Sequence, residues 1–197
     1  MNSSLLLAAS VFALVASGTP GPNNLMLAAS GLNHGFRRTV PLLLGIETGF
    51  LLLLLAVALG LGALFEQFPL MKLVLKAFGV AYLLHLAYKL WRSSGSNGQS
   101  GVKPLGFVQG AAFQVINPKA WMMVVSATSA YTLSGEDYWA SVWTLVLIFL
   151  LIGLPSITAW AAFGAGLRTV LEDPRKAKLI GRGMSVLTAL SCLLILW

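Results

Sequence analysis

Thr19-Pro20-Gly21-Pro22-Asn23-Asn24 interrupts an apolar run that contains no Lys, Arg, Asp or Glu between Met1 and Phe36. Each proline inside a helix removes an amide donor and clashes with the preceding turn. A bilayer cannot hydrate the backbone groups that such a break frees, so a break at membrane depth must lie against protein or a wet cavity. The stretch therefore predicts a broken transmembrane helix and marks a candidate binding site.

The composition of the chain is typical of a membrane protein. Of its 197 residues, 57% are hydrophobic and 10% are charged, and the mean hydropathy of +0.83 lies outside the range of soluble domains. A helix needs about 20 apolar residues to span a bilayer. Six runs of that length predict an all-α membrane protein in which residues 1–197 form a single transmembrane domain. They lie near residues 5–30, 40–64, 69–90, 105–131, 139–167 and 178–197.

The first run could instead be a cleaved signal peptide, because Ala16-Ser17-Gly18 resembles a small-residue cleavage site. A signal peptide begins with positive charge, which this run lacks, and the apolar sequence continues directly after the break. These two features favour a retained first helix.

Positive charge gathers in three connections that alternate with acidic ones. The formal net charge is +7, and ten of the 13 lysines and arginines lie between predicted helices. The positive-inside rule places such connections in the cytoplasm, so both termini are expected outside. The charge therefore indicates topology and not a nucleic-acid partner. The basic connections are 33–39 with Arg37 and Arg38, 88–104 with Lys89, Arg92 and Lys103, and 168–182 with Arg168, Arg175, Lys176, Lys178 and Arg182; the others carry Glu66, and Glu136 with Asp137.

A linker rich in glycine and serine, residues 93–103, divides the chain near its middle. Each half, about 1–92 and about 104–197, would contain three helices, and an odd number makes the second half enter the membrane from the opposite side. Asn117-Pro118-Lys119 breaks the first helix of the second half, as the first break does in the first half. This pattern predicts two inverted three-helix repeats with broken helices one and four, and a midplane binding site.

Four motifs, in order along nearly the whole chain, resemble the LysE/RhtB family of amino-acid exporters. The resemblance implies six transmembrane helices, a prokaryotic inner-membrane location, and efflux of amino acids or their derivatives by a proton-coupled antiporter that is often a dimer. The motifs are Thr19-Pro20-Gly21-Pro22-Asn23, Gly45 with Gly49, Lys76-Ala77-Phe78-Gly79-Val80-Ala81-Tyr82-Leu83, and Asn117-Pro118-Lys119-Ala120.

The first break offers groups that could bind an amino acid. A helix that restarts near Pro22 or Asn23 presents free amides and the positive end of its dipole, which bind anions such as a carboxylate. Asn23 and Asn24 add carboxamides that both donate and accept hydrogen bonds. The structural alternative is a proline kink in which Asn23 only caps freed backbone. The candidate substrate-binding residues here are Pro20, Gly21, Pro22, Asn23 and Asn24.

The second break adds Asn117, Pro118 and Lys119 to the candidate substrate-binding residues. Pro118 disrupts the helix and Asn117 can cap the restarted one. Lys119 lies about halfway through the span, where an ammonium group is costly unless it is paired, hydrated or neutral. It could hold a substrate carboxylate, pair with a carboxylate of the protein, or titrate. The alternative is that Lys119 snorkels to the interface, which its stem reaches poorly from mid-span.

Glu47 and Lys76 are the candidates for proton coupling. Glu47 is the one acid clearly inside a predicted helix, one or two turns from its cytoplasmic end. Burial favours a neutral carboxyl group and a nearby cation favours a charged one, so Glu47 could exchange a proton or form a static ion pair with Lys76 or Lys119. The family pattern usually keeps Gly45 and Gly49 without a glutamate between them, so Glu47 could instead tune substrate choice. Lys76 matches the family lysine and could act on substrate or protons, or form a structural pair.

Other function classes need residues that this chain does not offer. A membrane enzyme or thiol relay needs clustered His, Asp and Glu or paired cysteines, whereas the chain has two distant histidines and one cysteine. A metal-ion or other small-solute exporter of the wider LysE superfamily is the main alternative, but a metal exporter needs several intramembrane acids or histidines. A scaffold would not explain two breaks. We expect no catalytic residue, no metal site and no cofactor.

The leading interpretation is a proton-coupled exporter whose two broken helices enclose one site. The substrate carboxylate would meet the freed amides and Lys119, and its ammonium group the asparagine carbonyls. The small number of acids in the spans favours neutral or hydroxylated amino acids over lysine and arginine. The expected partners are the substrate, protons, the lipid bilayer and a second copy of the chain.

Overall fold

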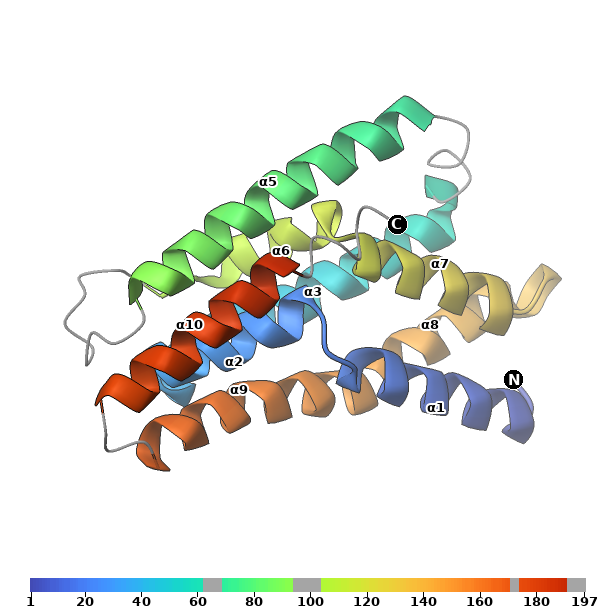
Figure 1. Ribbon diagram of the computed structural model, residues 1–197. Helices are drawn as coiled ribbons and strands as arrows, with labels where there is room; N and C mark the ends of the chain where they lie inside the picture. The colour runs from blue at the N-terminus through green and yellow to red at the C-terminus, as the bar shows by residue number, and fades with distance from the viewer. Residues whose placement is uncertain (62–68, 94–103, 171–173, 191–197) are drawn as a thin grey trace.

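The computed structural model describes residues 1–61, 69–93, 104–170 and 174–190, and the regular elements within these ranges are helical. The helices follow the apolar runs that the sequence predicts (Figure 1). The first half of the chain forms α1 (Ser3–Gly18), α2 (Pro22–His34), α3 (Phe36–Ala56) with a π-helical extension η1 (Val57–Leu61), and α5 (Pro69–Ser93). The second half forms α6 (Phe107–Ile116), α7 (Pro118–Tyr131), the 3-10 turn η2 (Gly135–Asp137), α8 (Tyr138–Ile148), the π-helical η3 (Phe149–Gly153), α9 (Leu154–Val170) and α10 (Pro174–Leu190).

Both predicted breaks are present. Helix α1 ends at Gly18 and α2 begins at Pro22, with 53° between the two helices. Helix α6 ends at Ile116, and α7 begins at Pro118. Proline suits the first position of a helix because an amide there would have no intrahelical partner. Each break is therefore the end of one helix and the start of another.

Three segments within the described ranges are candidates for crossing a membrane. Two continuous helical stretches, Phe36–Leu61 and Gly135–Arg168, are long and apolar enough to span. The bent pair α1 and α2 passes the same test when its two parts are taken together. The protein is thus an all-helical, multi-pass membrane protein.

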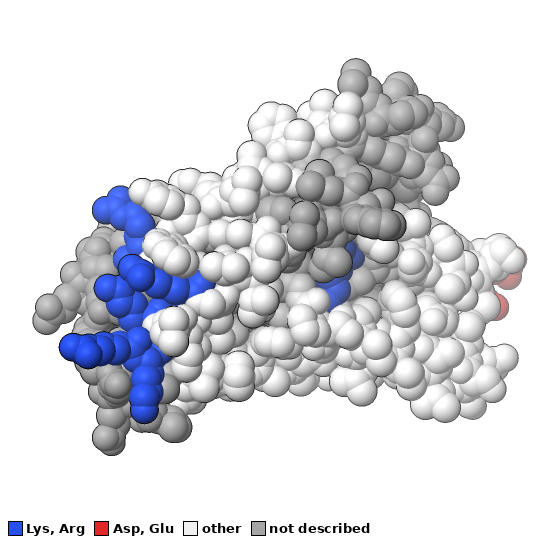
Figure 2. Space-filling view, in the orientation of Figure 1, with Lys and Arg blue, Asp and Glu red and all other residues white. Residues whose placement is uncertain are grey.

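Charged side chains gather at opposite ends of the molecule. Figure 2 shows a dense group of lysines and arginines at one end, which we call the basic end, and acidic side chains at the other, which we call the acidic end. At the basic end α2 and α9 finish and α10 begins (Figure 1). The acidic end holds Glu136 and Asp137, between α7 and α8.

On the basic side of the breaks, glycines bring helix backbones into direct contact. A Cβ atom on Gly31 of α2 would overlap the carbonyl of Ala161 in α9, and one on Gly164 would overlap that of Ala28. Between α3 and α6, Gly45 lies in the same way against the backbone of Phe107. Small residues allow this close packing between membrane helices. Helix α2 is therefore packed tightly on α9, and α6 on α3.

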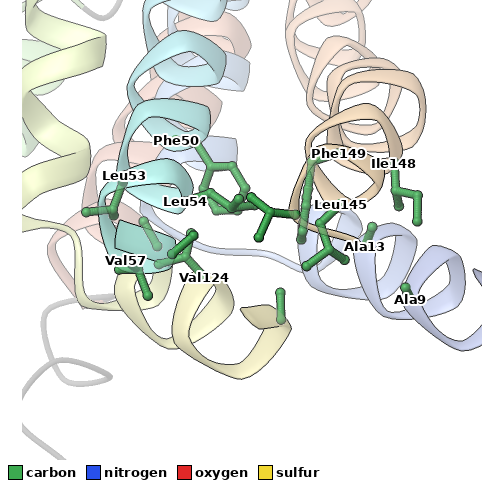
Figure 3. Close-up of a cluster of buried hydrophobic side chains, with 14 of the residues drawn as sticks. Ala9, Ala13, Phe50, Leu53, Leu54, Val57, Val124, Leu145, Ile148 and Phe149 are labelled. Carbon is green, nitrogen blue, oxygen red and sulfur yellow. The ribbon is translucent and has the colours of Figure 1, made fainter. Parts of the chain in front are cut away.

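Two hydrophobic clusters lie on either side of the breaks. The acidic-end cluster joins α1, α3, α7, α8 and η3, and Figure 3 shows Phe50, Val124 and Phe149 among its members. The basic-end cluster joins α2, α3, α5, α6 and α9 and includes Met26 and Phe113. The polar residues of the breaks lie between these two clusters.

Candidate functional site

The carbonyl groups that the first break frees are bound by side chains. The amide nitrogen Nδ2 of Asn24 donates to the backbone oxygen of Ser17 at 2.7 Å and to that of Thr19 at 2.8 Å. The indole Nε1 of Trp160, on α9, donates to the oxygen of Gly18 at 3.1 Å. Asn24 was predicted from sequence, whereas Trp160 was not. The end of α1 is thus held by a residue of its own break and by a distant helix.

Lys119 connects the second break to the first. Its Nζ atom donates to the backbone oxygen of Thr19 at 2.9 Å, to the Thr19 hydroxyl at 3.0 Å and to the oxygen of Pro20 at 3.4 Å. Its stem lies against Gly21, where an added Cβ would come 2.8 Å from the lysine Cδ. Lys119 therefore does not snorkel to an interface. The acceptors are neutral, so they leave a net positive charge at the break.

Asn23 and Gln114 form a reciprocal amide pair between α2 and α6. Nδ2 of Asn23 donates to Oε1 of Gln114 at 2.9 Å, and Nε2 of Gln114 donates to Oδ1 of Asn23 at 3.1 Å. Gln114 is fully buried, and its Nε2 also donates to the backbone oxygen of Gly110 at 3.0 Å. The sequence motifs do not include Gln114. Its position one turn before the Asn-Pro-Lys motif, inside an apolar helix, was the available signal.

The second break is satisfied mostly by its own residues. Oδ1 of Asn117 accepts from the backbone amide of Lys119 at 3.2 Å, so Asn117 is the N-cap of α7 as the sequence predicts. The indole Nε1 of Trp121 donates back to the oxygen of Val115 in α6 at 2.7 Å. This break is a local structure that α6 and α7 complete between them.

The motif from Lys76 to Leu83, on α5, packs against this second break. A Cβ atom on Gly79 of α5 would overlap the backbone oxygen of Ile116, and the ring of Tyr82 stacks on Phe113 with 5.3 Å between centroids. The side chain of Lys76, in the same motif, is outside the part of the chain that the structure describes. The candidate role of Lys76 stays a prediction.

Glu47 is a buried carboxyl group near both breaks. It lies on α3, which begins at Phe36, so it is about three turns from the start of its helix and deeper than the sequence-based estimate of one or two turns. Its side chain is 7% exposed, and Oε1 has no hydrogen-bond partner within the described structure. Lys119, one of its proposed ion-pair partners, donates instead to the carbonyls of the first break. Glu47 is therefore open to interaction with a ligand or a proton.

One cavity brings most of the predicted site residues together. The empty space between its lining atoms is about 440 Å³ when the open mouth is counted. The predicted residues that line it are Gly21, Asn23, Asn24, Glu47, Asn117 and Lys119. Pro20, Pro22 and Pro118 are not lining residues and act through the helix ends that they define. The remaining wall is Ala16, Ser17, Ile46, Phe50, Ala120, Met123, Phe149 and Ile157.

Comparison with known proteins identifies the family of this chain. Residues 14–196 match the model of the LysE type translocator family. The chain belongs to this family. Named relatives are the cysteine/O-acetylserine efflux proteins of Klebsiella pneumoniae, 31% identical over 166 residues that cover 83% of this chain and 84% of the relative, and of Salmonella typhimurium, 30% identical over 164 residues with the same coverage. No solved structure gives a significant match.

Family membership confirms the resemblance that the sequence motifs indicate. The family description is that of a translocator and the relatives are named efflux proteins, so this LysE chain is a transporter and not an enzyme. Within the described residues, no group of three or more His, Cys, Asp and Glu is placed to hold a metal ion.

Proposed function

We propose that this LysE family member is a secondary active exporter of small neutral amino acids or their derivatives across the prokaryotic inner membrane, coupled to protons. The observation that carries the proposal is the cavity in which residues of both breaks meet. Lys119 is bound to the first break, and Glu47, whose Oε1 has no hydrogen-bond partner among the described residues, lies in the same wall. The names of the relatives, cysteine/O-acetylserine efflux proteins, favour a small substrate.

The proposed topology has six transmembrane helices in two inverted repeats, about 1–92 and about 104–197, joined by the linker at 93–103. Each repeat begins with a helix that stops and restarts at a proline. The gathering of lysines and arginines at one end supports placing that end in the cytoplasm and both termini outside (Figure 2). A homodimer, which the family resemblance implies, stays a prediction.

In the proposed binding mode, the substrate carboxylate lies at the start of α2. The first amides of a helix have no intrahelical partner, and Pro22 has no amide, so those of Asn23 and Asn24 are available to an anion. The ammonium group of Lys119 adds a positive charge beside them, held over Gly21. A carboxylate there gains charge-assisted hydrogen bonds, which are stronger than those between neutral groups.

The substrate ammonium group would face the oxygen atoms of the cavity. Asn24 directs its carboxamide nitrogen toward the end of α1, so its side-chain oxygen is left to accept. In this conformation the side-chain oxygen of Asn23 accepts from Gln114, and it is released to the substrate when that pair opens. The apolar walls from Phe50, Met123 and Phe149 suit a short, uncharged side chain. A lysine or arginine substrate would bring a second cation close to Lys119.

Glu47 is the proposed proton carrier. A carboxyl group within a membrane is costly in its charged form unless it is paired, and Oε1 of Glu47 has no partner in the described structure. Since Glu47 lines the substrate cavity, its protonation changes the charge that the substrate ammonium meets. Lys76 is the alternative carrier.

Counterflow in proteoliposomes tests the proposed function. Purified protein is reconstituted, loaded with one unlabelled amino acid and offered a labelled one, across a panel that includes cysteine, O-acetylserine, serine, threonine, lysine and arginine. We expect saturable exchange of the small neutral compounds. Saturable exchange of lysine or arginine alone would refute the proposed substrate class.

A further inference from the structure

The pair formed by Asn23 and Gln114 borders the cavity on its basic side. Asn23 lines the cavity, whereas Gln114 is buried behind that wall, three residues before the cavity residue Asn117. The neighbours of this pair in the chain, Met26 and Phe113, belong to the basic-end cluster. The amide pair therefore lies where the cavity meets the basic-end cluster.

The amide pair also joins two packed units. Helix α2 contacts α9 through Gly31 and Gly164, and α3 contacts α6 through Gly45 and Gly110. Backbone contacts of this kind leave little room for sliding within a unit, because the atoms are already at packing distance. Separation is easier along the seam between the units. Across that seam, Asn23 and Gln114 provide two neutral hydrogen bonds, Ser30 and Thr39 share another between α2 and α3, and the apolar contacts of the basic-end cluster complete it.

A neutral amide pair is suited to repeated opening. The net contribution of such a hydrogen bond is small when water replaces the partner, but a buried amide left without any partner is strongly disfavoured. The pair therefore stays closed while the seam is dry and opens when water or substrate enters. A substrate ammonium group can take the Asn23 oxygen that Gln114 otherwise occupies.

We infer that Asn23 and Gln114 form the gate of the transport path on the basic side, and that Gln114 is a positioning residue that sets the side to which the cavity opens. This inference rests on the proposed function, because a gate presupposes that a solute passes through the cavity. Its test by labelling does not depend on the identity of the substrate, because it measures access to the cavity.

The test uses a single-cysteine reporter at Ala120, a small residue of the cavity wall. In a Cys192→Ser background, Ala120→Cys is labelled with a membrane-impermeant thiol reagent in vesicles of each orientation. Adding Gln114→Leu removes both bonds to Asn23, and we expect labelling from the basic side to rise at least about fivefold, as the penalty for an unpartnered buried amide indicates. Labelling from the acidic side should not rise.

Two controls separate gating from general loosening. Gln109→Leu changes the same residue type on the same helix but removes the hydrogen bond to the amide of Gly106 instead. Labelling of Ala120→Cys should then be as slow as it is without this change. The exchange Asn23→Gln with Gln114→Asn keeps two facing carboxamides and should restore slow labelling. Unchanged labelling in Gln114→Leu, or an equal rise from both sides, would overturn the gate.

A cross-link tests the same gate without weakening it. In Asn23→Cys with Gln114→Cys, a short bis-methanethiosulfonate reagent joins α2 to α6, and a reducing agent reverses the link. The Ala120→Cys reporter is left out of this variant, because the reagent would also modify it, and counterflow is measured instead. We expect the linked protein to exchange no substrate and to regain exchange after reduction. Exchange while the link is intact would contradict the proposal. Failure of amino-acid counterflow in the unmodified protein would instead refute the proposed function and leave the labelling result standing.

Discussion

The two breaks look alike in sequence but are stabilised in different ways. At the second break, Asn117 caps the helix that it begins, and Trp121 bonds back to Val115 across the gap. At the first break, Asn24 binds the oxygens of Ser17 and Thr19, but the carbonyls also take hydrogen bonds from Lys119 in the other half of the chain and from Trp160 on α9. The hydrogen bonds of the second break come from its own residues, whereas those of the first come partly from distant residues.

This difference assigns different tasks to the two breaks. A break that closes itself can hold its shape whatever its neighbours do, and Asn117 keeps Lys119 at a fixed place on α7. At the first break, Lys119 donates to neutral oxygens, and it can leave them for a substrate carboxylate, which is a stronger acceptor. The first break is therefore the responsive half of the site, and the second break is its rigid support.

The largest expected effect follows removal of the side chain that links the two breaks. Lys119→Ala should lower transport about 100-fold or more, because one or two charge-assisted hydrogen bonds of about 1.5–3 kcal/mol each are lost. Lys119→Arg should restore little, since the planar guanidinium does not replace the compact ammonium at three oxygens. Counterflow with matched membrane abundance measures the effect. Normal transport by Lys119→Ala would show that the side chain linking the two breaks is not needed for transport.

The next effect concerns Glu47, which lies beside both breaks. If Glu47 carries the coupling proton, the carboxyl group takes up that proton from the outer side of the membrane. Wild-type efflux should therefore rise as the outer pH falls. Glu47→Gln is fixed in an uncharged form and should show transport that no longer responds to pH. The measurement is proteoliposome efflux at a series of outer pH values. A variant with the wild-type pH response would exclude Glu47 as the carrier and leave Lys76 as the candidate.

A smaller effect is expected at the second break. Asn117→Ala removes the N-cap of α7 and should lower the free energy of unfolding by about 1 kcal/mol, with a loss of transport because Lys119 is displaced. Asn117→Asp keeps an acceptor at the cap and should retain most of the stability. Thermal unfolding in detergent measures both variants. If Asn117→Ala is as stable as the wild type, the second break is not held by its own cap.

The smallest effect is expected at Trp160. Trp160→Phe keeps the ring but removes the hydrogen bond to Gly18, and should cost about 0.5–1.5 kcal/mol. Trp143→Phe is the matched control, because Trp143 is exposed on α8 and has no recorded bond of this kind in the described structure. Thermal unfolding of the two variants gives the comparison. Equal stability of both would mean that the first break does not depend on α9.

Local sequence patterns predict the helices and both breaks well. Proline position and the residue that follows it are local properties, so Pro22 and Pro118 fix the helix starts, and Asn117 is identifiable as a cap. The placement of basic residues predicts the charged ends in the same way (Figure 2). Each of these features depends on neighbours in the chain.

Contacts between distant helices could not be predicted from the sequence in the same way. Gln114 and Trp160 stand in apolar stretches, and their partners are 91 and 142 residues away. Their roles depend on how α6 and α9 pack, which glycine contacts determine in three dimensions. The depth of Glu47 was underestimated for a related reason, since α3 begins before its apolar run does.

Protection of a cysteine in the cavity by substrate tests most directly whether the two breaks form one substrate site. Ser17 lines the cavity, and Ser17→Cys replaces only its oxygen by sulfur. In a Cys192→Ser background, the rate at which a thiol reagent labels this cysteine reports whether the cavity is occupied. The ligand is O-acetylserine, because it has no thiol. We expect saturating O-acetylserine to slow the labelling of Ser17→Cys. It should have no effect on Ser17→Cys combined with Lys119→Ala. It should also have no effect on the control Ser129→Cys, which is exposed on α7. Equal protection with and without Lys119 would contradict a site shared by the two breaks.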